Sequence, residues 1–341
     1  MANEQWMSAF TDRDDLSLSD ITIPASHDAG LSENHFYPYH KTSPRKHCVC
    51  QEYDIAGQLA AGSRFFDLRI EKKGNHLHTL HGEGFGRLGG AHGQKAGEIF
   101  EQVRTFLDTN DKEIVILRIT HTEAKHNVHQ LVADKLGDRL YKCRPTTKIA
   151  LAKLSKMKGK AIAIFDKKAL KEANAEQGFH RLTKVTEGGK IASGLGLCGE
   201  YAGGSAGILS MARFAIERGS DHGTHKLNSN GWHDHLFMVY WQLTYDVEKK
   251  AIGKSDESNA NLQTISATAG THYNLDYLLN TYRGKDTGTV TDDKGKNALK
   301  IKVTQGTLRQ HRPNIINLDF VNEAVCNKII TFNTEFLPKL G

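Results

Sequence analysis

A β-branched run at residues 21–24 leads directly into His27 and Asp28, and then into Gly30. An apolar run that stops at a proline predicts a short buried strand, and the glycine marks the turn that follows it. The two titratable side chains therefore fall at the carboxyl end of a strand, where a catalytic base can be placed. Taken alone, the pair is more often a turn-capping aspartate beside a hydrogen-bonded histidine. Its interpretation depends on the strand ends that follow.

Residues 62–70 form a second strand-like segment, in which Asp67 and Arg69 share one face with Phe65 while Arg64 points the other way. The charges on this strand can form an internal salt bridge. A buried ion pair is weak evidence of stability, because desolvation opposes the Coulomb attraction. A planar guanidinium that stays charged also suits a phosphate group. We therefore expect Arg69 to bind an anion, with the ion pair as the alternative.

Two later strand ends carry further candidates. His78 and His81 cannot both face the same way on a regular strand, and His81, beside Gly82, is the better placed to project into a site. Asp319 ends an apolar run and precedes a helix-like pattern. It can be the N-cap of that helix, or it can orient a histidine and stabilise its charged form.

In this order, the segments resemble the bacterial phosphatidylinositol-specific phospholipases C, the X-domain group of the phospholipase C-like phosphodiesterases. The resemblance spans nearly the whole chain and rests on residues 23–30, 62–70, 81–82, 113–117 and 314–321. It implies an α/β fold, a distorted (β/α)8 TIM barrel. In such barrels the chemistry gathers at the carboxyl ends of the strands, where His27, Arg69 and Asp319 fall.

The hydrophobic pattern agrees with a single barrel domain over residues 1–341. Apolar residues at helical spacing in 99–107 and 128–136 alternate with strand-like runs, which favours a parallel sheet with helices outside. Only six prolines and no low-complexity linker favour one domain. Residues 283–300 are predicted to be a polar insertion. The predicted strands are 21–25, 62–70, 113–119, 160–165, 192–198, 236–243, 262–268 and 313–320.

The resemblance implies a role for each candidate residue. His27 would be the general base that takes the proton from the inositol 2-hydroxyl, and Asp319 would hold its tautomer. Arg69 would bind the non-bridging phosphate oxygens as charge builds. His81 would be the general acid that protonates the departing diacylglycerol oxygen, assisted by Asp28. The expected products are diacylglycerol and inositol 1,2-cyclic phosphate, because the nucleophile is tethered beside the phosphorus.

We expect no cofactor and no catalytic metal. Calcium-dependent relatives place acidic residues near the second and third strands, and the corresponding positions here are Arg69 and about Thr120. A guanidinium there replaces the charge of a divalent cation. Recognition of the inositol ring is harder to predict, because the chain does not reproduce the family's residues one for one. The candidates are Asp67, Arg118, Asp166, Tyr240 and Gln242, with Trp241 as another possible stacking platform.

Charge and composition indicate the partners. A net charge of +6, from 45 basic and 39 acidic residues, suits an anionic phospholipid or membrane surface and is too small to imply nucleic acid. No run has the length of a spanning helix, so lipid contact would be peripheral, through the aromatic cluster at 35–39 unless that loop folds over its own barrel. Five cysteines make no even disulfide framework. We expect a monomer, and the resemblance favours a secreted protein whose signal peptide has been removed, with a cytosolic protein as the alternative.

Two other functions fit parts of the sequence. A compact cluster can hold zinc in a metal-dependent phosphodiesterase, although its Gly, Asn and Ser neighbours are typical of an ordinary loop. The cluster consists of His222, His225, His233, Asp234 and His235. The other possibility is a catalytically silent barrel that binds inositol lipids or phosphates. Against it, none of the catalytic candidates is replaced by an inert residue.

Overall fold

The computed structural model describes most of the chain. The described residues are 3–40, 45, 48–82, 90–184, 193–199, 234–241, 275–276, 278–280, 283, 290–291, 298–299 and 312–336. None of the helices within these ranges is both long enough and apolar enough to cross a membrane.

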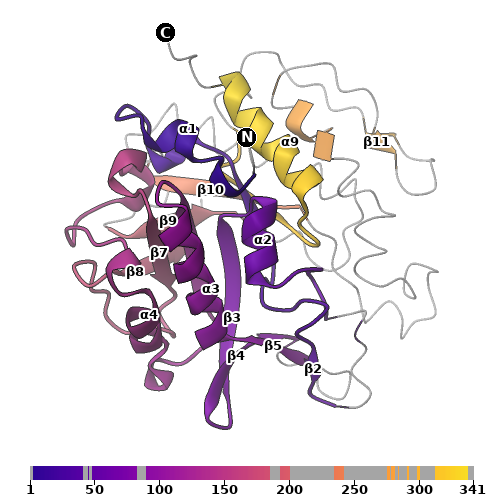
Figure 1. Ribbon diagram of the computed structural model, residues 1–341, viewed down its shortest axis with the longest axis vertical. Coiled ribbons are helices and arrows are strands. Elements are labelled where there is room, and N and C mark those ends of the chain that lie inside the picture. Colours follow the sequence, from indigo (N-terminus) through magenta and orange to yellow (C-terminus); the bar gives the residue numbers. More distant parts are fainter. Residues whose placement is uncertain are drawn as a thin grey trace.

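Eight parallel strands form a closed barrel, which confirms the predicted (β/α)8 fold (Figure 1). The ring closes because β1 (Ile23–Ser26) pairs with β3 (Phe65–Lys73) on one side and with β13 (Ile315–Leu318) on the other. Between β3 and β13, in order, lie β6 (Ile114–Thr120), β7 (Lys160–Phe165), β8 (Phe179–Lys184), β9 (Leu195–Cys198) and β10 (His235–Tyr240).

The sequence prediction missed β8. This strand mixes buried apolar and polar side chains, so its hydrophobic alternation is weak. His180 is buried with Nε2 2.8 Å from the Tyr141 carbonyl oxygen, and Arg181 donates to the Leu170 carbonyl oxygen at 2.6 Å. Tertiary hydrogen bonds therefore accommodate polar groups that interrupt the expected pattern. The predicted strand at 262–268 lies outside the described residues.

Helices pack around the barrel. The spacing at 99–107 and 128–136 predicted α3 and α4 correctly, and the late helical pattern corresponds to α9. In the described part of the chain, α-helices include α1 (Ser8–Thr11), α2 (Ile55–Ala61), α3 (Ala96–Thr109), α4 (Val128–Leu136) and α9 (Glu323–Phe336). The same part includes the 3-10 helices η1 (Asn3–Gln5), η2 (Leu18–Asp20), η5 (Ala124–His126), η6 (Gly137–Arg139), η7 (Ile149–Leu151) and η8 (Leu154–Lys156). Figure 1 shows α9 beside α2 and the N-terminal segment.

A small antiparallel sheet extends from the barrel, because β3 continues past the ring. It pairs with β4 (His76–His81), which pairs with β5 (Ala91–Lys95), which pairs with β2 (Tyr37–Pro38). Separately, β11 (Val290–Thr291) and β12 (Ala298–Leu299) pair with each other inside the predicted insertion. Most of that insertion lies outside the described residues.

Two apolar layers hold the barrel together. Phe65 belongs to the inner cluster and Phe66 to the layer between the strands and the helices, as the alternation on β3 predicts. The inner cluster also includes Trp6, Met7 and Phe10 from the N-terminal segment. These side chains pack with residues from the amino ends of the strands and close that end of the barrel. The carboxyl ends are left to form a site.

Candidate active site

His27 and Asp319 follow neighbouring strands and meet at the carboxyl end of the barrel. The His27 backbone N–H donates to the Leu318 carbonyl oxygen at 2.9 Å, and Nδ1 of the ring lies 2.8 Å from Oδ1 of Asp319. Both side chains are buried. The N-cap alternative for Asp319 is wrong, because α9 begins later and Asn322 accepts the N-terminal bond, from the Val325 N–H at 3.0 Å.

The carboxylate of Asp28 is the centre of the site. Its oxygens lie 2.7 Å from Arg69 Nε, 3.5 Å from His81 Nε2 and 3.6 Å from His27 Nε2, and its side chain is completely buried. The backbone of Asp28 has φ 39°, in the left-handed region that non-glycine residues seldom adopt. Such strain persists where surrounding contacts impose it, typically at functional sites. Here it coincides with a carboxylate that contacts three charged or titratable groups.

Arg69 lies between the buried carboxylates and solvent. Its Nη2 lies 3.2 Å from His27 Nε2, and 26% of its side chain is exposed, so a ligand can reach the guanidinium. Because a guanidinium only donates hydrogen bonds, His27 Nε2 accepts from it, and the neutral imidazole carries its proton on Nδ1 toward Asp319. That tautomer leaves Nε2 as the basic nitrogen.

An internal ion pair with Arg69 accounts for only some of the charged side chains on and beside β3. Asp67 lies closer to Arg118, at 3.2 Å, than to Arg69, at 4.0 Å. Arg64 points the other way and contacts Glu113 at 2.7 Å, with both side chains buried. The guanidinium of Arg69 therefore makes its closest ion pair with Asp28 and stays at the open side of the site.

Close packing between two loops brings His81 to Asp28. The Gly30 carbonyl oxygen accepts from the Gln94 N–H at 2.8 Å, and a Cβ on Gly30 would lie 2.1 Å from Thr79 Oγ1. Only a glycine therefore lets the loop after β1 approach the β4–β5 hairpin this closely. His81, at the end of β4, faces Asp28 as a result, whereas Nδ1 of His78 lies 3.1 Å from the Gly93 carbonyl oxygen.

The charges of the site shift its pKa values in different directions. Burial opposes a charged imidazole at His27, but Asp28 and Asp319 outweigh burial and raise the pKa of His27. Burial would raise the pKa of Asp28, but the neighbouring cations, chiefly Arg69, outweigh it and lower that pKa. At His81, burial, supported by Arg69 and His27, prevails over Asp28 and lowers the pKa. The two imidazoles therefore differ in proton affinity.

A second polar group lies inside the barrel next to the site. Arg118 Nη1 lies 3.2 Å from Asp67 Oδ1 and donates to the Tyr240 hydroxyl at 3.2 Å. Three of the predicted substrate-binding residues thus form one network. Asp166 accepts from the N–H groups of residues 168 and 169 at 2.9 and 2.8 Å and caps the turn after β7. Its role in substrate binding, like that of Gln242, which lies outside the described residues, stays a prediction.

Gln51 is a positioning residue that sequence reasoning missed. Its Nε2 donates to the carbonyl oxygens of His27 at 2.8 Å and Leu318 at 3.1 Å, and its Oε1 accepts from the Val321 N–H at 3.0 Å. The side chain thus joins the ends of β1 and β13 directly behind the His27–Asp319 pair. In the sequence, Gln51 is distinguished only by its position after the short apolar run 48–50. That run shows neither helical nor strand periodicity, so it predicts no structural role for the residue that follows.

The histidine cluster proposed for zinc is only partly described. Asp234 and His235 lie at the start of β10, at the amino end of the barrel, and Asp234 forms an ion pair with Lys148. His27 lies at the opposite end. Residues 222, 225 and 233 of the cluster lie outside the described residues.

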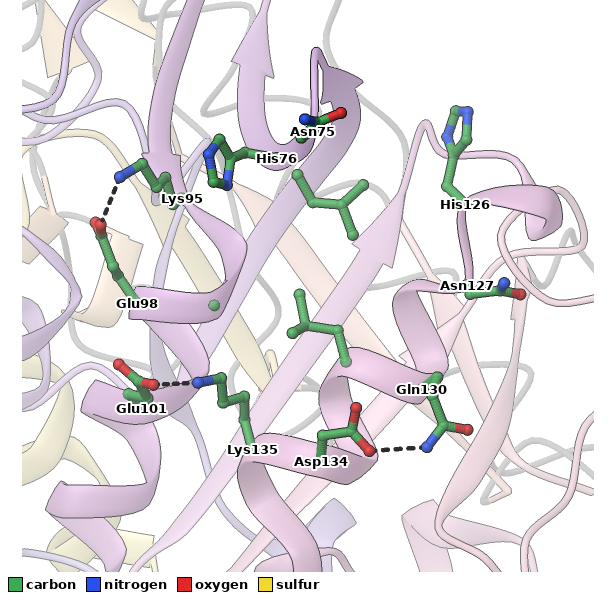
Figure 2. Close-up of a pocket in the computed structure, with 13 residues that line it drawn as sticks. Asn75, His76, Lys95, Glu98, Glu101, His126, Asn127, Gln130, Asp134 and Lys135 are labelled. Atoms are coloured by element: carbon green, nitrogen blue, oxygen red, sulfur yellow. Dashed lines mark hydrogen bonds and ion pairs between the residues drawn. The ribbon is translucent and has the colours of Figure 1, made fainter.

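A surface cavity of about 480 Å³ lies away from this site, between β4, α3 and α4 (Figure 2). Its charges already pair with one another: Lys95 with Glu98 at 3.2 Å, and Lys135 with Glu101. Gln130 donates to Asp134 at 2.8 Å. None of the predicted catalytic side chains lines it.

Less than half of the chain matches a known family. Residues 18–168 match the family described as phosphatidylinositol-specific phospholipase C, X domain. This region includes His27, Arg69 and His81 and ends before β8. The matched region holds four of the eight parallel strands of the barrel, β1, β3, β6 and β7.

Two vertebrate proteins are similar to part of this chain. PI-PLC X domain-containing protein 3 of Danio rerio is 30% identical over 164 residues, 40% of this chain and 48% of that protein. The Homo sapiens protein of that name is 31% identical over 105 residues, 28% of this chain and 30% of that protein. The chain thus spans about half the length, or less, of these relatives. Because both are vertebrate proteins, the resemblance to the bacterial enzymes in particular stays a prediction.

Solved structures agree with the barrel over nearly the whole chain. Phosphatidylinositol-specific phospholipase C from Listeria monocytogenes is similar with a TM-score of 0.63 and 15% identity, over 97% of this chain and 99% of that chain. A mutant of the Staphylococcus aureus phosphatidylinositol-specific phospholipase C is similar with a TM-score of 0.61 and 14% identity, over 97% of this chain and 98% of that chain. At identities this low, the similarity shows a shared fold alone.

Proposed function

We propose that this chain is a phosphatidylinositol-specific phospholipase C that works without a metal ion. The observation that carries the proposal is the convergence of two imidazoles and one guanidinium on the carboxylate of Asp28. General acid–base catalysis of phosphodiester cleavage needs a proton acceptor, a proton donor and a positive group for the phosphate oxygens. His27, His81 and Arg69 supply these three functions.

In the first step, His27 Nε2 takes the proton of the inositol 2-hydroxyl. The freed oxygen attacks the neighbouring phosphorus, and the bond to the diacylglycerol oxygen breaks. Asp319 stabilises the imidazolium that forms, because it accepts from Nδ1 at 2.8 Å. The tethered nucleophile favours a five-membered ring, so the product is inositol 1,2-cyclic phosphate.

Arg69 and His81 act on the phosphate and the leaving group. The partly exposed guanidinium binds the non-bridging oxygens and neutralises charge that a divalent cation would otherwise balance. His81 donates its proton to the departing diacylglycerol oxygen. Asp28 lies between them and fixes the position of both. Arg118 and Tyr240, within the adjacent network, are the proposed contacts for the inositol hydroxyls.

We propose a secreted monomer, with residues 1–341 in one domain, that meets anionic phospholipid at a membrane surface. Tyr37, from the predicted aromatic cluster, is 47% exposed on β2 at the edge of the small sheet, which supports peripheral contact there.

One experiment tests the function and the absence of a catalytic metal together. Phosphatidylinositol vesicles are incubated with the protein in excess EDTA, and phosphorus NMR follows the lipid and inositol phosphates. We expect the cyclic phosphate to appear first, at a rate unchanged by EDTA. Loss of turnover in EDTA that calcium restores would contradict the metal-free mechanism. Binding of vesicles without any product would instead favour the catalytically silent barrel.

A further inference from the structure

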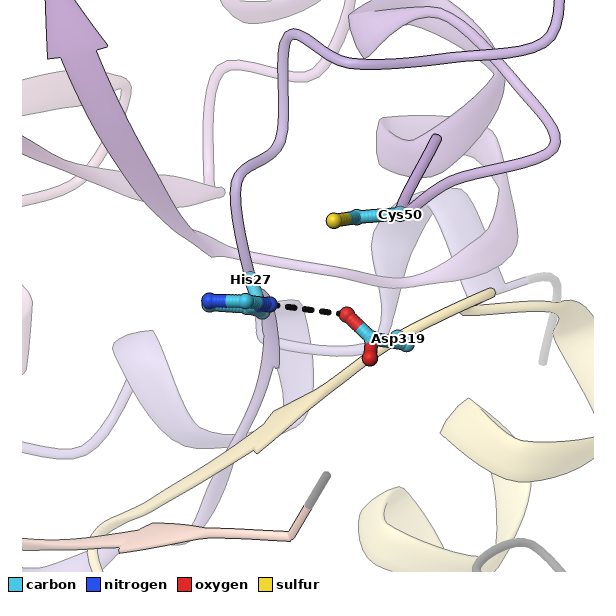
Figure 3. A group of neighbouring side chains, drawn as sticks. All are labelled: His27, Cys50 and Asp319. Carbon is cyan, nitrogen blue, oxygen red and sulfur yellow. Dashed lines mark hydrogen bonds and ion pairs between the residues drawn. The ribbon is translucent and has the colours of Figure 1, made fainter. Parts of the chain in front are cut away.

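The thiol of Cys50 lies beside the candidate catalytic residues, although the proposed mechanism does not use it. Ligand atoms of His27, Cys50 and Asp319 all lie within 4.8 Å of one another, and the three residues are buried (Figure 3). A second trio, Asp28, Cys50 and His81, meets the same limit. One sulfur is therefore shared by two groups that each offer an imidazole and a carboxylate.

We infer that His27, Cys50 and Asp319 form a binding site for a thiophilic divalent cation such as Zn²⁺, and that the bound cation inhibits the protein. Zinc in proteins is held by thiolate, imidazole and carboxylate ligands, and three of these leave a fourth position for water. Ligand atoms on one tetrahedral zinc are roughly 3.4–3.7 Å apart, given bonds of about 2.0–2.3 Å. Since the ligand atoms of the trio lie within 4.8 Å of one another, they need adjustments of up to about 1.4 Å to reach that geometry.

The backbone holds Cys50 in a position that favours this site. Its N–H donates to the Leu31 carbonyl oxygen at 2.9 Å, and its carbonyl oxygen accepts from the Phe320 N–H at 2.8 Å. The first contact ties Cys50 to the loop after β1, and the second ties it to the residue after Asp319. The sulfur is therefore placed by the same two chain segments that place the other two ligands.

The position of Arg69 decides which trio is the better site. A third trio, His27, Asp28 and Asp67, also meets the distance limit, but Arg69 lies 2.7 Å from Asp28 and 4.0 Å from Asp67. Its guanidinium repels a cation there. Arg69 contacts the Nε2 side of His27, whereas Asp319 contacts the Nδ1 side. The trio with Cys50 and Asp319 is therefore the one of the three that contains neither carboxylate paired with Arg69.

Binding replaces protons and removes the catalytic pair. The cation takes the place of the proton between His27 Nδ1 and Asp319, so the neutral imidazole then carries its proton on Nε2, and the displaced thiol proton passes to solvent. A metal-bound imidazole is a weaker base, and Asp319 no longer orients it. The predicted inhibition rests on the proposed function, whereas the predicted binding does not.

The binding test uses Co²⁺ as a spectroscopic probe of thiolate coordination. The protein, residues 1–341, is titrated with Co²⁺ in thiol-free buffer, and the sulfur-to-cobalt charge-transfer absorption is recorded. We expect this absorption in the wild type and in Cys48→Ser, a matched control because Cys48 is buried in the same segment and belongs to none of the three trios. It should be absent from Cys50→Ser, and from Cys50→Ala should the serine variant not fold.

The inhibition test measures phosphatidylinositol cleavage against free Zn²⁺. Wild type and Cys48→Ser should lose activity together and regain it when EDTA is added. Cys50→Ser should need at least about tenfold more Zn²⁺ for half-inhibition, the scale on which losing even an outer-shell partner weakens a metal site. Charge-transfer absorption that persists in both Cys50 variants, or that never appears in the wild type, overturns the inference. Absorption without any lipid cleavage would contradict the proposed function while supporting the metal site.

Discussion

The imidazole of His27 lies 2.8 Å from the carboxylate of Asp319, although 292 positions separate the two residues in the chain. The register of the barrel explains this contact. Ser26 of β1 pairs with Leu318 of β13, so His27 and Asp319 are the next residues of two adjacent parallel strands. Closing the ring is therefore the event that assembles this pair.

Asp319→Asn should lower kcat by roughly 10²–10⁴, because an amide can neither stabilise the imidazolium nor select its tautomer. The variant should keep its fold, as checked by circular dichroism. Asn322→Ala is the matched control: it removes the cap of α9 and should lower the free energy of unfolding by about 0.5–2 kcal/mol with kcat unchanged. Equal rates for wild type and Asp319→Asn would exclude the orienting role.

His27→Ala and His81→Ala should each abolish turnover and leave the protein folded, because each removes one of the two proton-transfer groups. The measurement is initial-rate cleavage of phosphatidylinositol vesicles. His78→Ala is the control, since His78 lies on the same strand as His81 but contacts the Gly93 carbonyl oxygen. A near-normal rate for either variant of the catalytic pair shows that its role has been assigned wrongly.

The pH profile should reveal that the free protein favours the unproductive protonation state. The base, His27, must be neutral, but its pKa is raised, so it still carries its proton at pH values where an ordinary histidine has lost it. The acid, His81, must be charged, but its pKa is lowered, so it is already neutral at pH values where an ordinary histidine is charged. The productive state is therefore a minor species, and kcat/KM should follow a low bell whose acidic limb lies at the pKa of His81 and whose basic limb lies at the pKa of His27.

Bound substrate should increase the productive fraction. The phosphodiester anion favours the charged form of His81 and so raises its pKa toward that of His27. Because kcat reports the complex and kcat/KM the free enzyme, the acidic limb of kcat, which lies at the pKa of His81, should lie at higher pH than that of kcat/KM. Coincident acidic limbs would contradict the assignment of His81 as the acid beside the phosphate.

Arg69→Lys should lower kcat/KM by roughly 10- to 1,000-fold, even though the charge is kept. A lysine ammonium cannot present the planar, forked set of donors that binds two phosphate oxygens. Inhibition by a phosphonate analogue should weaken in parallel, which separates loss of anion binding from misfolding. An Arg69→Lys enzyme with wild-type kinetics would remove the guanidinium from the mechanism.

Glu113→Ala should lower the free energy of unfolding by about 3–5 kcal/mol, because it leaves the fully buried Arg64 without its carboxylate partner. Urea unfolding measures the change. Glu101→Ala, which removes a solvent-exposed partner of Lys135, should cost less than about 1 kcal/mol. Since Glu113 precedes β6 at the amino end of the barrel, the variant should keep kcat at temperatures where it remains folded.

Local patterns predicted the parts of this structure that depend on neighbouring residues in the chain. Alternation on β3 placed Asp67 and Arg69 inside the barrel, and a glycine beside His81 indicated which histidine enters the site. The prediction failed where distant segments supply the partners. β8 depends on the Tyr141 carbonyl oxygen, and Gln51 acts only because β1 and β13 meet beside it.

The late position of β13 has a consequence for synthesis. Until residues 312–318 leave the ribosome, β1 and β10 have unpaired edges that can associate with other chains. Asp319 emerges only after those residues, so a nascent chain carries its imidazoles, guanidinium and thiol long before it can use them. Pairing of β13 with β1 therefore completes the ring and the His27–Asp319 contact in one step, late in synthesis.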